Sequence, residues 1–295
     1  SFKTEKLLSK KGFDKKSAFQ SNWKKSVWKV YEDAELPRKW HNELSLYAKK
    51  IGIDFFTSPW DFDAVDLLKE LKVPAIKVGS GDITYHEILK KIAKLKKPVI
   101  LGTGASTMQE ISDAIKIIKS TGNNKIILLH SITQYPSPIE EANLKALESL
   151  KQKFNLHVGY SDHSPGLIIP LASVALGASV IEKHFTIDPK SMGPDHLHSL
   201  DPLEFTNMVN GIRTLENSFG NGIKKVEKSE KQTRIIQRRG IWTTKQIQKG
   251  EKFSKLNIAA LRPVEGLPAS EFKKIINKKA KFFFDAYVPI KKSDL

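Results

Sequence analysis

The sequence predicts an α/β fold of the (β/α)8 TIM-barrel type, followed by a small α+β domain. Three observations predict it. Short apolar runs alternate with helical patterns of about 10–15 residues, and polar residues follow several of these runs. Beyond about residue 220 a charged segment is followed by short strand-like pieces. Such alternation is typical of βαβ units and a parallel sheet. The runs are almost continuously apolar, as expected for strands covered on both faces.

The N-terminal residues 1–36 are polar and rich in lysine, and they predict loop with short helix. Scattered aromatic residues lie among them, including Phe19, Trp23, Trp28 and Tyr31. From Pro37 to Lys50 a helical pattern follows, and Gly52 is its expected stop because glycine favours the left-handed end of a helix.

Six strand–helix units follow. The predicted strands are 53–57, 75–79, 98–101, 126–130, a short apolar run that leads into the 158–166 stretch, and the strand that carries His184 in 180–186. The predicted helices pass through 65–71 and 88–92, begin at Thr107, cover 144–154, end near Gly177, and cover 202–219. Thr107 and Glu110 form a capping-box pattern, which satisfies free N–H groups at a helix start.

Polar residues at many strand ends favour a barrel over an open doubly wound sheet. They are Lys77, Ser80, Thr103, Tyr135, His163 and His184. In a barrel the carboxyl ends of all strands converge on one site, whereas an open sheet binds at one switch point with a glycine-rich turn. The short glycine pairs at 79–81 and 102–104 do not match that turn.

The chain is expected to divide into a barrel domain at 1–220, a charged linker at 221–238 and a small α+β domain at 239–295. Of the net charge of +17, residues 221–295 contribute +12, from 19 Lys and Arg against 7 Asp and Glu. A basic segment can bind a polyanion or simply be a solvated surface. No aromatic RNA-binding box or zinc-finger spacing supports nucleic acid.

Composition excludes several classes of protein. There is no cysteine, so disulfides, zinc–thiolate sites and cysteine nucleophiles are excluded. No apolar run approaches the roughly 18 residues that span a bilayer, and no signal peptide is evident at the lysine-rich start. We therefore expect a cytoplasmic protein without membrane association.

Two histidines at adjacent strand ends are the first candidate site. His163 and His184 each follow an apolar strand, and each has a carboxylate close by, Asp162 and Glu182, that could orient it. Two imidazoles with few carboxylates suit an open site for Mn, Zn or Fe. The alternative is a pair of hydrogen-bonded structural histidines. The histidines in the 193–198 loop are ranked lower.

Lys77 lies inside an apolar strand, where its ammonium needs an anionic partner. A pocket for a phosphate or carboxylate, shared with Ser80, Thr103 and Ser161, is the most economical interpretation. A Schiff-base lysine and a structural ion pair are the alternatives.

Several motifs together resemble one family. They are FTSP at 56–59, PAIKVGSGD at 74–82, GTG at 102–104, SDH at 161–163, EKHFT at 182–186, GPDH at 193–196 and LRP at 261–263. In this order and spacing the chain resembles the sialic acid synthase family, which includes N-acetylneuraminate, legionaminate and pseudaminate synthases. Its C-terminal part resembles the antifreeze-like SAF domain of that family.

The resemblance implies roles for individual residues. His163 and His184 would bind the metal, usually Mn2+, with Mg2+ or Co2+ as alternatives. Lys77, Ser80 and Ser161 would hold phosphoenolpyruvate. Tyr135 and Asp195 would contact the sugar, and Arg262 would reach it from the partner subunit of a domain-swapped homodimer.

The chain departs from the family pattern at two places. Gly102 stands where the family usually has serine, so Thr103 or a backbone N–H is expected to replace that hydroxyl. The family also begins with a strand that carries a catalytic Glu near an Asn–His pair, and a second strand that ends in Lys; neither is present. The six predicted strands would then be strands three to eight of an N-terminally truncated barrel.

The implied activity is a transferase reaction that condenses phosphoenolpyruvate with N-acetylmannosamine or a related acylated hexosamine. It would release a nonulosonic acid and phosphate. The alternatives are another phosphoenolpyruvate–aldose synthase, an inactive fragment, and a polyanion-binding protein.

Overall fold

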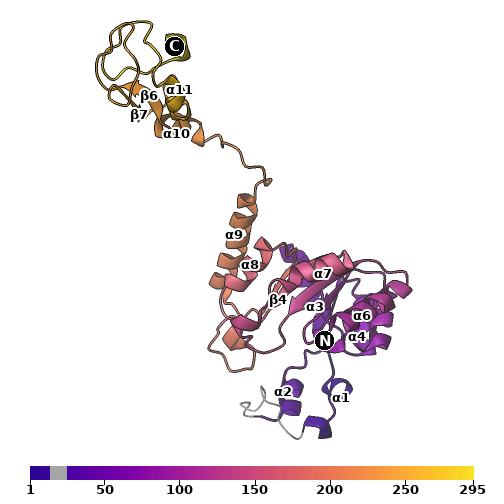
Figure 1. The fold of residues 1–295 in the computed structure, drawn as a ribbon. Helices are drawn as coiled ribbons and strands as arrows, with labels where there is room; N and C mark the ends of the chain where they lie inside the picture. The colour runs from indigo at the N-terminus through magenta and orange to yellow at the C-terminus, as the bar shows by residue number, and fades with distance from the viewer. Residues whose placement is uncertain (14–24) are drawn as a thin grey trace. The chain divides into compact units, whose positions relative to one another are not determined.

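The structure is a computed structural model that describes residues 1–13 and 25–295. It divides into two compact units, Ser1–Phe219 and Gly220–Leu295 (Figure 1). Phe19 and Trp23 of the predicted N-terminal loop lie outside the described residues. Short helices do form on both sides of that gap, at α1 (Thr4–Leu7), η1 (Lys11–Phe13) and α2 (Val27–Asp33).

The first unit alternates strands and helices as predicted. Its strands are β1 (Ile76–Val78), β2 (Val99–Gly102), β3 (Ile126–Ser131), β4 (His157–Asp162) and β5 (Ile181–Lys183). Its longer helices are α3 (Trp40–Ile51), α4 (Phe62–Glu70), α5 (His86–Ala93), α6 (Met108–Ser120), α7 (Ala146–Phe154), α8 (Ile168–Ala175) and α9 (Pro202–Ser218). Three short 3-10 turns lie between them, η3 (Ser80–Asp82), η4 (Ile139–Glu141) and η5 (His196–His198).

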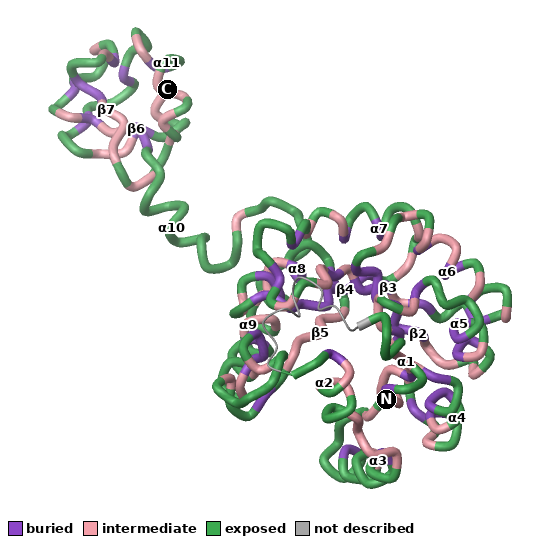
Figure 2. The backbone as a smooth tube through the Cα atoms, turned by 90° about the horizontal axis from the view of Figure 1, so that it is seen from below, coloured by how far each residue is buried: buried purple, intermediate pink, exposed green. Residues whose placement is uncertain are grey.

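The sheet has the order β1–β2–β3–β4–β5, and every pairing is parallel. Each strand pairs with the next strand along the chain, so the described sheet has no switch point. A doubly wound sheet would reverse its strand order at such a point. Figure 2 shows the strands as an inner arc and helices α4–α7 as an outer arc. The predicted α/β class with a parallel, curled sheet is therefore confirmed, and the described residues form five strands of it rather than a closed eight-stranded barrel.

Local signals explain where the helices begin and end. The Thr107 side chain accepts from the Glu110 backbone N–H, and the Glu110 carboxylate accepts from the Thr107 N–H, which is the predicted capping box. Helix α3 ends at Gly52, whose φ of 80° lies in the left-handed region. Asp201 caps α9 in the same reciprocal way, with Glu204.

The predicted strand at 53–57 is wrong. This stretch is extended but unpaired, and the Ile53 and Phe56 side chains are exposed. A strand needs a ladder partner, and the backbone just after this stretch bonds to Ser1 instead: the Ser1 amine donates to the Ser58 carbonyl, and the Trp60 N–H donates to the Ser1 carbonyl. The apolar run is thus strand-like in composition only. The sheet of the described residues has five strands rather than six.

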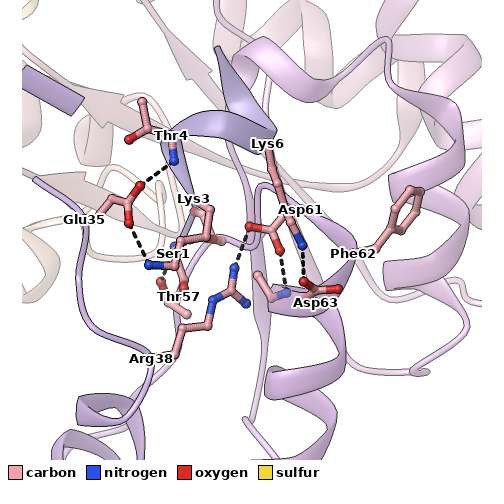
Figure 3. A network of polar contacts seen from close by, with 12 residues as sticks. Ser1, Lys3, Thr4, Lys6, Glu35, Arg38, Thr57, Asp61, Phe62 and Asp63 are labelled. Carbon is pink, nitrogen blue, oxygen red and sulfur yellow. Dashed lines mark hydrogen bonds and ion pairs between the residues drawn. The ribbon is translucent and has the colours of Figure 1, made fainter. Parts of the chain in front are cut away.

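A polar network ties the first residues of the chain to the start of α4 (Figure 3). Asp61 caps α4 by accepting from the Ala64 N–H at 2.8 Å, and it also accepts from Arg38 at 2.5 Å. Glu35 accepts from the Thr4 N–H and pairs with Lys3 at 2.7 Å. These bonds fix the segments around residues 1–8 and 35–38 against the rest of the first unit.

The main core lies between the outer face of the sheet and helices α4–α7. Its fully buried members include Leu68, Ile76, Leu89, Leu101 and Leu128. Helix α3 is different, because a row of its large apolar side chains is exposed: Trp40, Leu44, Leu46, Tyr47 and Ile51. An exposed apolar face of this kind marks a surface that another segment or molecule covers.

The second unit has its own core. Strands β6 (Gly240–Thr243) and β7 (Ile258–Leu261) pair antiparallel, and the short helices are α10 (Glu230–Gln237), η6 (Ala269–Glu271), α11 (Phe272–Ile275) and η7 (Lys292–Asp294). Ile241, Phe253, Ile275 and Ile290 are buried together. Helix α10 forms inside the segment predicted to be a linker, and the Ile235 carbonyl accepts from Val264 of the same unit.

None of the helices in the described part of the chain combines the length and the apolar character that a membrane span requires.

Candidate metal and substrate site

The candidate site lies at the carboxyl ends of β4 and β5. These strands pair in the register Tyr160 with Ile181, Ser161 with Glu182, and Asp162 with Lys183. Side chains on a strand alternate between its two faces, so Ser161 and Glu182 point to one side and the Asp162–Lys183 pair to the other. His163 and His184 are the next residues along the two strands. The register therefore brings the two predicted histidines to the same edge.

His163 is held in one orientation by the neighbouring strand end. Its Nδ1 lies 2.9 Å from the Ile132 carbonyl oxygen and 3.3 Å from Ser131 Oγ. A carbonyl oxygen only accepts, so Nδ1 carries the proton and donates. The lone pair of Nε2 is then free to bind a metal ion or accept a proton. The Ile132 carbonyl therefore orients His163, not a carboxylate as we had expected from Asp162.

Four aromatic rings gather at this edge. The ring centres of His163 and His184 lie 5.3 Å apart, and the ring of His198 lies 4.7 Å from that of His184. Tyr135 completes the group, with its ring centre 4.2 Å from that of His163 and 5.7 Å from that of His198. The structure thus brings His163, His184 and Tyr135 together as predicted residues, and it adds His198.

His198 and Asp195 reach the cluster from a loop, 187–199, that leaves and returns to the sheet edge. The loop is closed at its base, because the Leu200 N–H donates to the His184 carbonyl. Within it, η5 makes a single 3-10 turn that follows Asp195. Residues three apart lie on the same side of a 3-10 helix, so Asp195 and His198 face the same way. His196 faces elsewhere, and its Nδ1 lies 2.6 Å from Thr186 Oγ1.

Burial keeps the three clustered imidazoles neutral. It lowers the pKa of His163 and of His184, where nearby Asp195 partly opposes the effect. Burial, aided by the repulsion of His184, lowers the pKa of His198 to about 4. Burial also raises the pKa of Tyr135 to about 12, so its phenol stays protonated at neutral pH. Neutral imidazole is the form that binds a metal ion.

Lys77 finds its anionic partner across the sheet. Its Nζ lies 3.1 Å from Glu182 Oε1, and the same oxygen accepts from Ser161 Oγ at 2.6 Å. The Lys77 side chain is only 13% exposed, whereas that of Glu182 is 40% exposed. Lys77 and Ser161 are therefore neighbours, as the predicted anion pocket requires, and Glu182 binds them rather than orienting His184.

Behind the histidines, Asp162 and Lys183 form a fully buried ion pair. Lys183 Nζ lies 2.6 Å from Asp162 Oδ2, and both side chains are 0% exposed. Lys183 also donates to the Ser164 carbonyl, and the Ser164 hydroxyl donates to Asp162 at 2.7 Å. With each charge paired and hydrogen-bonded, the pair locks the ends of β4 and β5 immediately before the two histidines.

Ser80 and Thr103 lie at the ends of β1 and β2, but both are engaged. Ser80 Oγ accepts from the Gly104 N–H at 3.0 Å, and Thr103 Oγ1 donates to the Leu129 carbonyl at 3.0 Å. A Cβ built at Gly102 would lie 2.8 Å from Ser80 Oγ. A side chain at position 102 would therefore crowd Ser80, and glycine avoids this contact.

Arg262 lies in the second unit, directly after β7, and the other predicted residues belong to the first. From sequence, His198 is a candidate ranked below His163 and His184, and the bonding role of Glu182 was missed. A signal for His198 was present, because an aspartate and a histidine three residues apart in a tight turn face the same direction.

The donor set fits a divalent transition metal. Single ligand atoms of His184, Asp195 and His198 lie within 4.8 Å of one another. Both ring nitrogens of His198 are buried and have no hydrogen-bond partner among the described residues. A buried polar atom without a partner is costly, and a metal ion would satisfy one of these nitrogens. Imidazole with carboxylate suits Mn, Fe, Co or Zn.

Together, a curled parallel sheet and a cluster of lysine, imidazoles and carboxylates at its carboxyl edge are typical of an enzyme of the barrel class. The family comparison is more specific: residues 1–224 match the NeuB family model and residues 238–295 match the SAF domain model. The chain belongs to the NeuB family.

Curated relatives support this assignment. The chain is 44% identical over 285 residues to the N,N'-diacetyllegionaminic acid synthase of Campylobacter jejuni, covering 95% of this chain and 85% of that protein. It is 35% identical to the pseudaminic acid synthase of Helicobacter pylori, covering 92% of this chain and 80% of that protein. The solved N-acetylneuraminic acid synthetase of Leptospira borgpetersenii is 34% identical, with a TM-score of 0.67 over 72% of this chain and 75% of that one.

Proposed function

We propose that this protein condenses phosphoenolpyruvate with N-acetylmannosamine or a related N-acylated hexosamine to give a nonulosonic acid and phosphate. One observation carries the proposal: the Lys77–Ser161 pocket and the histidine cluster occupy the same sheet edge in a chain of the NeuB family. The reaction needs a cationic pocket for one substrate and an electrophile-binding site for the other, close together.

In the proposed complex, Lys77 and Ser161 bind phosphoenolpyruvate. Lys77 is nearly buried, so its charge interacts strongly with an anion in the pocket. Glu182 now pairs with that ammonium, and its greater exposure allows it to release Lys77 to an incoming phosphate or carboxylate. The Ser161 hydroxyl then donates to the same anion. Ser80 is the third proposed contact, through its hydroxyl beside the Gly104 N–H.

Tyr135 and Asp195 bind the sugar in this proposal. The protonated Tyr135 phenol is a hydrogen-bond donor and not a base. Asp195 is exposed, with Oδ2 at 3.9 Å from His184 Nδ1, so its carboxylate can accept from a sugar hydroxyl beside the histidines.

His163 and His184 are the proposed metal ligands, with Mn2+ as the first candidate and Mg2+ or Co2+ as alternatives. When bound, the ion supplies Lewis acidity toward a carbonyl oxygen. Overall, a bond forms between carbon 3 of phosphoenolpyruvate and the aldehyde carbon of the open-chain sugar. Water adds to carbon 2, and phosphate leaves. The residues named here hold the two carbons close together, which is the main gain from binding both substrates.

We also propose that two further β/α units, together with the stretch 53–57 as a paired strand, complete an eight-stranded barrel with β1–β5. The exposed apolar face of α3 and the unpaired stretch 53–57 support this, since both offer surface and backbone to neighbouring elements. The same proposal includes a cytoplasmic homodimer in which Arg262 assists sugar binding. Its test is an Arg262→Ala variant, which should raise the KM for the sugar by about 10-fold or more because a charged hydrogen bond is lost, with a smaller effect on the KM for phosphoenolpyruvate.

The activity test measures phosphate release by this chain, and by a chain that carries the two proposed units, with Mn2+, phosphoenolpyruvate and a panel of N-acylated hexosamines. We expect release that depends on the sugar. His163→Ala should abolish it, whereas His157→Ala, at the exposed start of β4, should not. The absence of sugar-dependent release from both chains would overturn the proposed function.

A further inference from the structure

We propose that His198 is a third imidazole ligand of the metal site, and that it makes this site selective for transition metals over Mg2+. The inference concerns the metal site that the proposed function uses, but it depends only on ion binding. It rests on three features of the described residues: the isolation of the His198 ring nitrogens, the distances among the histidine rings, and the loop that carries His198.

The first feature is that the buried ring nitrogens of His198 have no hydrogen-bond partner among the described residues. His198 is 2% exposed, and the lack of a partner holds for both Nδ1 and Nε2. By contrast, His163 uses one ring nitrogen for the Ile132 carbonyl, and His130 uses one for the Ala142 carbonyl. An apolar side chain would fill the His198 position without the cost of two isolated polar atoms. An imidazole in this place is explained by a ligand.

The second feature is ring geometry. The ring of His198 lies 4.7 Å from that of His184 and 6.4 Å from that of His163. The His163–His184 distance of 5.3 Å falls between these values. Imidazoles that share one ion at about 2.1 Å from each nitrogen have ring centres roughly 4.5–6.5 Å apart. All three pairs fall within that range, while the residues whose ligand atoms all lie within 4.8 Å of one another are His184, Asp195 and His198, without His163. Asp195 adds a carboxylate, because its oxygen lies within 4.8 Å of the His184 and His198 ligand atoms.

The third feature is how the loop presents its donors. Asp195 and His198 are three residues apart around η5, so they face the same way. The ring of Tyr135 lies 5.7 Å from that of His198 and 4.2 Å from that of His163, and it closes the other side of the cluster. The loop is anchored at His184 itself, through the Leu200 N–H. The donors on the loop and His184, directly after β5, are therefore held in a fixed relative position by the same backbone hydrogen bond.

The consequence is metal preference. Mg2+ favours oxygen ligands and keeps several waters, whereas imidazole favours Zn, Co, Ni and Fe. Each added imidazole therefore strengthens binding of transition metals more than of Mg2+. Three imidazoles and one carboxylate should give the order of the Irving–Williams series, with Mn2+ bound more weakly than Co2+.

The first test counts ligands in the unaltered protein. X-ray absorption of the Co2+-loaded chain should give three imidazoles, and the visible absorption of Co2+ should report the same coordination shell. Two imidazoles would overturn the proposal without any substitution. No substrate is present, so this result is independent of whether the chain releases phosphate from phosphoenolpyruvate.

The second test uses His198→Ala and His198→Phe, with metal binding followed by calorimetry. We expect Co2+ and Zn2+ affinity to fall by more than about 100-fold, because losing even a group that orients a ligand costs 10- to 100-fold. Mg2+ affinity should change by less than about 3-fold, since Mg2+ binds through oxygen ligands and water rather than through imidazole. His157→Ala serves as the control and should bind all three ions as the parent does.

Two results would contradict the assignment. Unchanged Co2+ and Zn2+ affinity in His198→Phe would show that His198 is not a ligand. An equal loss for Mg2+ and Zn2+ in both variants would show that His198 only supports the fold of the loop. If phosphate release fails for every sugar while the Zn2+ loss is seen, the proposed function fails and the third ligand stands.

Discussion

The two units of the molecule differ in whether all of their buried polar side-chain atoms have hydrogen-bond partners. In the second unit, the buried polar side chains Thr243 and Asn257 are both hydrogen-bonded within the unit. In the first unit, buried polar atoms without a partner among the described residues occur at His198, and also near the chain start, at His41 and Trp60 among others. Among the described residues, the buried side-chain polar atoms without a hydrogen-bond partner all belong to the first unit.

This contrast separates stability from function. A polar group with partners stabilises a fold, because removing it leaves another group unsatisfied. A polar group without partners costs stability and is retained where a ligand compensates it. The Asp162–Lys183 pair shows that the first unit contains both kinds, side by side at one sheet edge.

The largest expected effect on stability is at that ion pair. Lys183→Met should lower the free energy of unfolding of the first unit by about 3–5 kcal/mol, because the buried Asp162 charge is left without its partner. Chemical denaturation followed by far-UV circular dichroism measures it. The double variant Asp162→Leu, Lys183→Met should lose much less, since no charge then remains buried. An equal loss in both variants would show that packing, and not charge pairing, holds this edge.

Lys77→Met should have a large effect on activity rather than on stability. We expect phosphate release to fall by about 10³-fold, close to 4 kcal/mol of transition-state stabilisation, because the anion pocket loses its cation. The free energy of unfolding should change little, since the exposed Glu182 keeps its hydrogen bond from Ser161 and remains hydrated. Enzyme assays and urea denaturation of the same preparation test both parts. A Lys77→Met variant that loses stability but retains activity would show that Lys77 supports the fold rather than the reaction.

The second unit offers the matching test of a satisfied group. Asn257 accepts from the Ser254 N–H at 2.7 Å and donates to the Lys252 carbonyl at 3.0 Å. Asn257→Ala should destabilise this unit by about 1–3 kcal/mol. Gln248→Ala, at an exposed position, is the control and should be neutral within about 0.5 kcal/mol. Thermal unfolding of the two variants distinguishes them, and equal melting temperatures would refute the expectation.

The smallest effect depends on pH. Burial raises the pKa of Asp82 to about 6 in the folded protein, against about 3.9 for an unfolded chain. Between these values the folded state binds more protons, so stability falls as the pH rises from about 4 to 6. Asp82→Asn should remove this loss and stabilise the protein above pH 6 by about 1 kcal/mol, since partial exposure screens the full effect. Below pH 4 the two proteins should be equally stable.

Urea denaturation at several pH values measures the Asp82 effect. A stabilisation that persists unchanged at pH 3.5 would point to a better-packed asparagine rather than to the loss of a buried charge.

The sequence predicted the parts of the fold that follow from local rules. The capping box at Thr107, the stop at Gly52 and the apolar strands β2 to β4 all depend on neighbours in sequence. The error at 53–57 has another cause. A strand also needs a neighbouring strand to pair with, and apolar composition alone does not show whether one is present.

The same distinction holds in the site. His163 and His184 were found because each ends an apolar strand, and parallel register brings strand ends together. The partners were harder to predict. Glu182 bonds Lys77 and Asp162 bonds Lys183, which depends on which face each side chain takes. His198 depends on the path of a loop, which periodicity does not describe.

The loop 187–199 is a segment that can be replaced as a unit. Its two ends are fixed to each other by the bond between Leu200 and His184, so its interior can vary while the sheet edge keeps its shape. The donors on β4 and β5 would then be constant, and the donors on the loop would be the variable part. Replacing one short segment could retune which ion the enzyme accepts, without redesign of the barrel that supports it.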